Sequence, residues 1–165
     1  MNASTEPALS ADKATQVRSH IFSKLNFSDI LQRLNASLDE WLSERNTDTL
    51  LADIRDVETK LSGSTTSFVT VVLNRIVERK DKERNELIAL LPLLRPAVSE
   101  SVSAIACTQL VSVLPDIQID VPLAATHISA ALAALDFSPA VLLDILTPLA
   151  GEASGSSNFE ILIAN

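Results

Sequence analysis

Two aspartates, Asp116 and Asp120, lie four residues apart in the segment 114–122, which has the sequence Leu-Pro-Asp-Ile-Gln-Ile-Asp-Val-Pro and is called the acidic segment below. Carboxylates in such a pair can act as general acid and base, or they can bind the cations of a partner. Acid–base catalysis needs pKa values shifted by an enclosing pocket, and we expect none around an exposed segment between two prolines. The pair therefore favours recognition of a basic surface over catalysis.

The other residue types that do chemistry are few and scattered. His20 and His127 lie on separate predicted helices, and no His, Cys or Asp spacing matches a metal site. The three glycines do not form a phosphate-binding loop. Cys107 lies within an apolar helical pattern, which favours a buried side chain over a reactive thiol. We therefore predict neither an enzyme nor a cofactor or metal site.

Charge is divided unevenly along the chain. The formal net charge is −8, yet all 13 Lys and Arg residues lie at or before Arg95, where 14 of the 21 acidic residues nearly balance them. The rest of the chain has seven acidic residues and no Lys or Arg. Such a surface repels nucleic-acid phosphates and attracts basic proteins over roughly 8 Å at physiological salt. Direct nucleic-acid binding by the acidic C-terminal half is therefore not expected.

Composition predicts a single helical domain in a reducing compartment. At 165 residues the chain fits one domain, and 47% apolar residues with only three Gly favour helices over a turn-rich β fold. A single cysteine excludes an intramolecular disulfide, and residues 1–14 lack the pattern of a secretory signal. The longest uncharged stretch, 121–135, is shorter than the roughly 20 residues of a membrane span. We therefore expect a soluble, cytoplasmic protein without membrane contact.

Apolar periodicity predicts about seven or eight helices with short connections. The segment 68–77 is rich in β-branched residues, but its polar positions do not alternate and both neighbours are helical, so a helix is predicted there too. The other helices are expected over 10–25, 28–45, 47–63, 87–94, 97–113, 122–135 and 138–149. These elements predict an all-α fold of stacked antiparallel hairpins, an atypical HEAT-like α-solenoid without a fixed repeat.

The two ends of the chain differ from the helical region. Residues 1–9 are polar and predict a mobile arm, whereas residues 10–150 form the predicted helical domain. Residues 151–158 have the composition of a flexible linker. The last segment, 159–165, is a short apolar tail that either packs back onto the domain or leads into a further element.

The acidic segment is predicted to be a stiff loop between two helices. Capping of the following helix would explain Asp120, with Pro122 in the first helical position. Capping does not explain Asp116 or the exposed-looking Ile117 and Ile119, so partner recognition is favoured, and both roles can hold at once. The two isoleucines are expected to exclude water from ion pairs between the aspartates and a partner.

Several motifs follow one another in an order that is typical of one known family. The most specific motif is Asp116, three residues, then Asp120-Val121-Pro122 at the opening of a helix. The others are the segments 38–42 and 46–51, Glu78 with Arg84, Leu90-Leu91, and 144–149. Together they resemble the MI domain, also called MA-3, of translation initiation factor 4G and programmed cell death protein 4. The likeness covers roughly residues 35–163, and the segment 144–149 is more similar to the initiation factor.

This resemblance implies a stack of helical hairpins that binds a DEAD-box RNA helicase, translation initiation factor 4A, in translation initiation or its regulation. By motif position, Asp116 and Asp120 are the main acidic contacts, Pro122 shapes the loop and Glu78 adds a second contact. Two related functions stay open, namely a scaffold of the same family in splicing or ribosome assembly and a translation inhibitor of the programmed-cell-death type. An acidic lipid-binding protein is disfavoured, because the polar faces lack the Lys and Arg that attract helices to anionic membranes.

Overall fold

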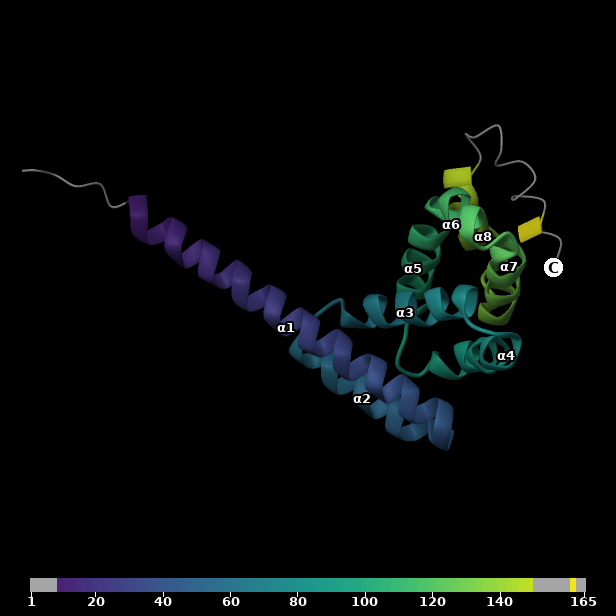
Figure 1. Cartoon of the computed structure of the whole chain (residues 1–165), viewed down its shortest axis with the longest axis horizontal. Helices are drawn as coiled ribbons and strands as arrows, with labels where there is room; N and C mark the ends of the chain where they lie inside the picture. The colour runs from purple at the N-terminus through teal and green to yellow at the C-terminus, as the bar shows by residue number, and fades with distance from the viewer. Residues whose placement is uncertain (1–8, 150–160, 163–165) are drawn as a thin grey trace, which may run out of the picture.

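The computed structural model describes the backbone of residues 9–149 and 161–162 and the side chains of residues 27–149 and 161–162. Between residues 9 and 149 there are eight α-helices, two 3₁₀ turns and no strand, which confirms the predicted all-α fold (Figure 1). The α-helices are α1 (Leu9–Glu44), α2 (Thr47–Lys60), α3 (Ser64–Glu78), α4 (Asp81–Leu90), α5 (Glu100–Ser112), α6 (Leu114–Asp120), α7 (Ala124–Leu135) and α8 (Pro139–Leu146). The 3₁₀ turns η1 (Leu91–Leu94) and η2 (Thr147–Leu149) follow α4 and α8.

The first two helices form a hairpin. The chain reverses within two residues, where Arg45 takes a positive φ of 61° and Asn46 caps α2 by accepting a hydrogen bond from the Thr49 amide. Leucines and Trp41 on α1 and aliphatic residues on α2 are buried between the helices and the rest of the fold. The sequence predicted two separate helices over 10–25 and 28–45, but the structure has one continuous helix, α1. No Gly or Pro lies within α1 to end it.

Glu58, near the end of α2, holds the start of α3. Its carboxylate accepts hydrogen bonds from the backbone N–H groups of Gly63 and Thr65 and from the hydroxyls of Ser64 and Thr65, at 2.5 to 3.0 Å. Partial burial acts to raise the pKa of Glu58, but these hydrogen bonds outweigh it and lower the pKa from its ordinary value to about 2. Because α3 has no capping side chain of its own, this carboxylate satisfies its first donors.

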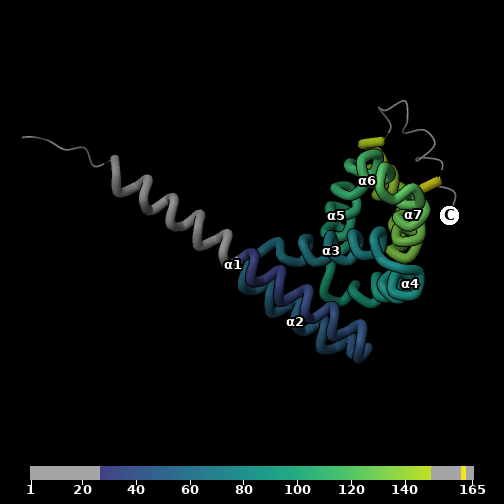
Figure 2. Tube along the Cα trace, in the orientation of Figure 1, coloured from purple at the N-terminus to yellow at the C-terminus, as the bar shows by residue number. Residues whose placement is uncertain are grey.

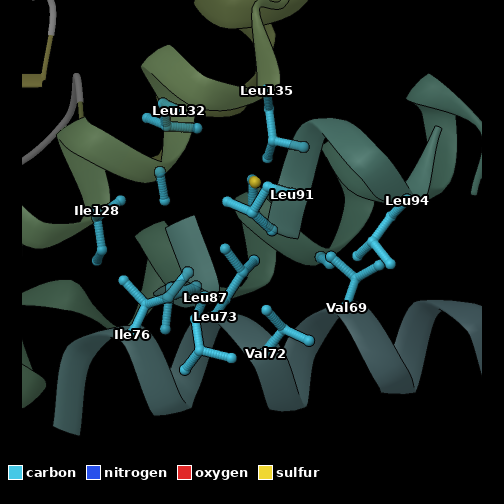
Figure 3. Close-up of a cluster of buried hydrophobic side chains, with 14 of the residues drawn as sticks. Val69, Val72, Leu73, Ile76, Leu87, Leu91, Leu94, Ile128, Leu132 and Leu135 are labelled. Atoms are coloured by element: carbon cyan, nitrogen blue, oxygen red, sulfur yellow. The ribbon is translucent and has the colours of Figure 1, made fainter. Parts of the chain in front are cut away.

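The central helix of the fold is α3, which contacts α1, α2, α4, α5 and α7. Phe68, Val72 and Ile76 on this helix are fully buried, and the β-branched segment 68–77 is helical as predicted. Side chains from α3, from the α4–η1 segment and from α7 meet in one apolar cluster (Figure 3). In a solenoid each repeat contacts only its neighbours. The contacts of α3 reach further than that, so the predicted hairpin stack is not confirmed.

Of the last four helices, α5 and α7 pack on α3, α6 packs on α5 and α7, and α8 packs on α5. Figure 2 shows the chain passing from the α1/α2 hairpin through α3 to the group formed by α5, α6, α7 and α8. The predicted start of the last helix is confirmed, because Ser138 caps α8 and Pro139 is its first residue. Within the described residues, no single helix is long and apolar enough to cross a membrane. Helices α5 and α6 reach such a length only together, across a bend of 60°.

The chain ends are described only in part. Of the predicted arm, only Leu9 is described, and it begins α1. The predicted linker, 151–158, lies outside the described residues. In the tail, Leu162 is buried, and the Ser129 hydroxyl of α7 donates a hydrogen bond to the Ile161 carbonyl at 3.2 Å. This part of the tail therefore packs back onto the domain.

Candidate partner-binding site

The acidic segment contains a short helix, α6, where a loop was the prediction. Pro115 lies in the first turn of α6, where a missing N–H is tolerated and the fixed φ suits a helix. The Ile117 amide donates a hydrogen bond to the Val113 carbonyl at 3.1 Å, and the Val121 amide donates one to the Ile117 carbonyl at 2.9 Å. Since α6 contacts both α5 and α7, the orientation of the acidic segment relative to the core is fixed.

One face of α6 anchors the helix to the core. Leu114 is fully buried, and Ile117 and Val121 are half-buried against the same core. These residues are three and four positions apart, which places them on one side of a helix. The prediction that Ile117 is exposed is therefore wrong, because it assumed a loop, in which no side of the segment would face the core.

The outer face of α6 combines carboxylates with exposed apolar side chains. Asp116 and Asp120 are exposed, and Ile119 between them is 80% exposed. Leu123, in the turn before α7, is 62% exposed, and Val113, at the end of α5, is 44% exposed. We call these five residues the acidic–apolar face. The sequence prediction missed Leu123 and Val113, which lie just outside the two ends of the acidic segment and outside α6, so no helical spacing marks them.

Neither aspartate of this face is neutralised by another described residue. Among the described residues, no ion pair or hydrogen bond engages the side chain of Asp116 or Asp120. Helices α5, α6, α7 and α8 contain no Lys or Arg that could reach them. Two negative charges four residues apart on a helix repel each other. A cation from outside the molecule would relieve that repulsion.

Capping does not explain Asp120. It is the last residue of α6, and α7 begins four residues later with no capping side chain. Pro122 lies in the turn before α7 and not in its first turn. The predictions that Asp120 caps this helix and that Pro122 is its first residue are therefore wrong. A carboxylate at the C-terminal end of a helix is disfavoured by the helix dipole. Local stability therefore gives no reason for an acidic residue at this position.

Glu78, the predicted second contact, resembles Asp120 in its setting. It is the last residue of α3, it is exposed, and its side chain has no ion pair or hydrogen bond within the described part of the chain. The helix dipole disfavours a carboxylate at this end of α3 as well. Its position is thus also unexplained by the stability of its own helix.

The end of α3 and the start of α7 lie at the same end of the molecule. Helix α3 contacts α7, and Ile76 of α3 and Ile128 of α7 lie on the same side of the apolar cluster (Figure 3). His127, in the first turn of α7, is close enough to the start of α4 to feel the charges of Arg84 and Asp81. Burial and then Arg84 lower the pKa of His127, while Asp81 opposes them. His127 therefore stays neutral at pH 7 and adds no cation to this end.

The side chains with catalytic or metal-binding chemistry do not cluster within the described residues. Within them, no group of three His, Cys, Asp or Glu side chains is placed to hold a metal ion. Cys107 is 2% exposed, and burial raises the pKa of its thiol to about 12. A thiol in that state is not a nucleophile at neutral pH. The side chain of His20 lies outside the described residues.

Comparison of the chain with protein-family models, with curated proteins and with solved structures finds no match. The resemblance to the MI domain thus stays a prediction from motifs. The function has to be argued from the geometry of the acidic–apolar face.

Proposed function

We propose that the chain is a protein–protein interaction module that binds a DEAD-box RNA helicase, translation initiation factor 4A, through the acidic–apolar face. The observation that carries the proposal is the pair of exposed carboxylates, Asp116 and Asp120, which lie on an anchored helix and have no ion pair with any described residue. A helicase that grips RNA offers basic surface, which such carboxylates attract. The MI-like motifs supply the identity of the helicase.

In this complex, Arg or Lys side chains of the helicase pair with the two aspartates. Ile119, Leu123 and Val113 surround the pairs and exclude water, as apolar residues do around the central contacts of other interfaces. Because the inner face of α6 is already fixed in the core, its outer face loses little conformational freedom on binding.

Two further residues contribute at the same end of the molecule. Pro122 has a fixed φ and restricts the turn between α6 and α7, which keeps the neighbouring Leu123 in place. Glu78, at the end of α3, offers a second carboxylate for a helicase surface that extends beyond α6.

The double variant Asp116→Ala, Asp120→Ala tests the proposal. Removing one member of a desolvated ion pair costs about 2 to 5 kcal/mol, so we expect binding to weaken by about 30-fold or more. Isothermal titration calorimetry with purified initiation factor 4A measures the affinity, and circular dichroism checks that helicity is retained. Asp144→Ala is the matched control, because Asp144 is also exposed and has no ion pair within the described residues. Unchanged binding by the double variant would refute the proposal.

Whether binding stimulates or inhibits the helicase needs a separate measurement. RNA unwinding by the helicase, followed with and without the chain, separates a stimulating scaffold from an inhibitor of the programmed-cell-death type. Capture from cytosolic and from nuclear extract separates a role in translation from one in splicing or ribosome assembly.

A further inference from the structure

The outer face of α5 lacks the charges that an exposed helix face usually carries. Ile105 on this face is 52% exposed, and its exposed neighbours along the helix are Ser101, Gln109 and Ser112. The only charged residue of α5 is Glu100, at its first position. The opposite face is buried in the core through Ser103, Ala106, Cys107, Leu110 and Val111. The outer face of a surface helix usually carries charged and polar residues, so an uncharged outer face with a half-exposed isoleucine is suited to contact with another molecule.

A groove of about 360 Å³ lies along this face, between α5 and α8. Ile145 of α8 is 1% exposed at its base, whereas Ile105 is half exposed at its edge. Only Asp144 among the lining residues is charged. The complete lining is Ala104, Ile105, Thr108, Gln109, Ser112, Val141, Asp144 and Ile145. This α5/α8 groove is thus a mostly apolar surface with one acidic group at its border.

The charges around the groove indicate the chemistry of its occupant. Asp144, the charged residue of the lining, is exposed and forms no ion pair within the described residues. No Lys or Arg follows Arg95 in the chain. An occupant therefore has to supply apolar side chains for the groove and cations for its acidic border. A second copy of the chain does not fit this requirement through the same face, because the lining of the groove offers no cation to Asp144.

We propose that the α5/α8 groove binds an amphipathic helix of a partner protein, with Lys or Arg along the border of its apolar stripe. A groove between two helices matches the ridge of apolar side chains that a third helix presents at three- and four-residue spacing. The groove does not include any residue of the acidic–apolar face. The proposal is therefore independent of helicase binding.

A synthetic helical peptide provides the probe. It has about 18 residues, which is enough for a stable helix, with Leu at three- and four-residue spacing and Lys on both borders of the Leu stripe. A peptide of the same composition in scrambled order is the control for charge alone. Titration into the full ¹⁵N-labelled chain should change the amide resonances around Ile105, Gln109 and Asp144. The scrambled peptide should bind at least about tenfold more weakly, a difference of about 1.4 kcal/mol.

Two variants separate this groove from the acidic–apolar face. Ile105→Lys places a like charge against the peptide and should weaken its binding at least about tenfold, a difference of about 1.4 kcal/mol. The fold should survive, because Ile105 is half exposed. The Asp116→Ala, Asp120→Ala variant should bind the peptide as the parent does. For the helicase we expect the opposite pattern, with binding retained by Ile105→Lys and lost by the double variant.

Four results would overturn the proposal. The first is that the peptide does not bind, and the second is that the scrambled peptide binds with the same affinity. The third is that Ile105→Lys binds the peptide as tightly as the parent, and the fourth is that the resonance changes lie on α6. Analytical ultracentrifugation of the parent and of Ile105→Lys adds a fifth outcome. Self-association of the parent that Ile105→Lys abolishes would make a second copy the occupant and would also refute a partner helix.

Discussion

Carboxylates of the α1/α2 hairpin and carboxylates of α5 to α8 have the same chemistry but opposite uses. In the hairpin, four of them hold helices together, namely Asp39, Asp53, Asp56 and Glu58. On α5, α6, α7 and α8, no described carboxylate has an ion pair or a hydrogen bond from a cation. The second region also contains no Lys or Arg, so these four helices offer their carboxylates no cation. The carboxylate of Asp136, in the turn between α7 and α8, pairs with Arg95 from outside the region at 3.6 Å.

Structural and functional acidic residues differ in the partners that their carboxylates have. A carboxylate that accepts several hydrogen bonds stabilises the fold and is costly to remove. An exposed carboxylate at a helix C-terminus stabilises nothing locally and is available to another molecule. The comparison predicts a clear order of stability effects, which the following substitutions test.

Glu58→Gln should be the most destabilising change. The amide keeps only one acceptor oxygen, so it cannot accept all four hydrogen bonds that Gly63, Ser64 and Thr65 donate to the carboxylate. The substitution also removes the negative charge from the start of α3. We expect the free energy of unfolding to fall by about 2 kcal/mol. Urea denaturation at pH 7 measures this change. Glu78→Gln, a matched substitution at an exposed carboxylate, should stay within about 0.5 kcal/mol of the parent.

Acid should remove the same contribution without any mutation. The folded-state pKa of Glu58 is lowered to about 2, so its stabilisation is present above the unfolded-state pKa of about 4.3 and is lost as the pH falls through 2. The difference in unfolding free energy between the parent and Glu58→Gln should therefore shrink steadily from pH 5 to pH 2. Denaturation series at several pH values measure it. A constant difference would mean that the charge of Glu58 is not the stabilising element.

Arg75→Gln should have an intermediate effect. The guanidinium is 13% exposed and links α3 to α1 by donating hydrogen bonds to Asp39 and to Asn35, at 2.5 and 2.9 Å. Because Asp39 is 64% exposed, solvent weakens the ion pair, and we expect a loss of about 1 kcal/mol. Thermal unfolding followed by circular dichroism measures it. Lys82→Gln, at an exposed position without an ion pair in the described residues, should leave the midpoint unchanged, and equal midpoints for both variants would contradict the assignment.

The sequence alone predicted most of the helices, because their apolar residues recur at helical spacing and local signals mark several of their ends. It missed that α4 begins at Asp81, within the charged stretch before the predicted helix 87–94. Ser138 with Pro139 marked the start of α8, and Gly63 the turn before α3. The central position of α3 depends on contacts between distant segments, and no local pattern specifies them. The Glu58 cap likewise joins residues whose spacing has no general signature.

The candidate site was predictable in its residues but not in its shape. The spacing of Asp116 and Asp120 and the absence of later cations pointed to an exposed acidic surface. Two flanking prolines suggested a loop, yet Pro115 starts a helix as readily as it interrupts one. Once the segment is helical, Ile117 turns to the core and Leu123 joins the outer face. A single wrong assignment of local structure thus changed which apolar residues accompany the aspartates.

The smallest effect on stability is expected for the Asp116→Ala, Asp120→Ala variant. The substitution removes the repulsion between two like charges and an acidic residue from the end of α6, and it introduces a better helix former. Its free energy of unfolding should therefore equal that of the parent within about 0.5 kcal/mol, or be slightly higher. Urea denaturation beside Glu58→Gln makes the comparison direct. A loss of more than about 1 kcal/mol would assign these aspartates to the fold, as in the hairpin, and the loss of helicase binding could then no longer be attributed to the acidic–apolar face.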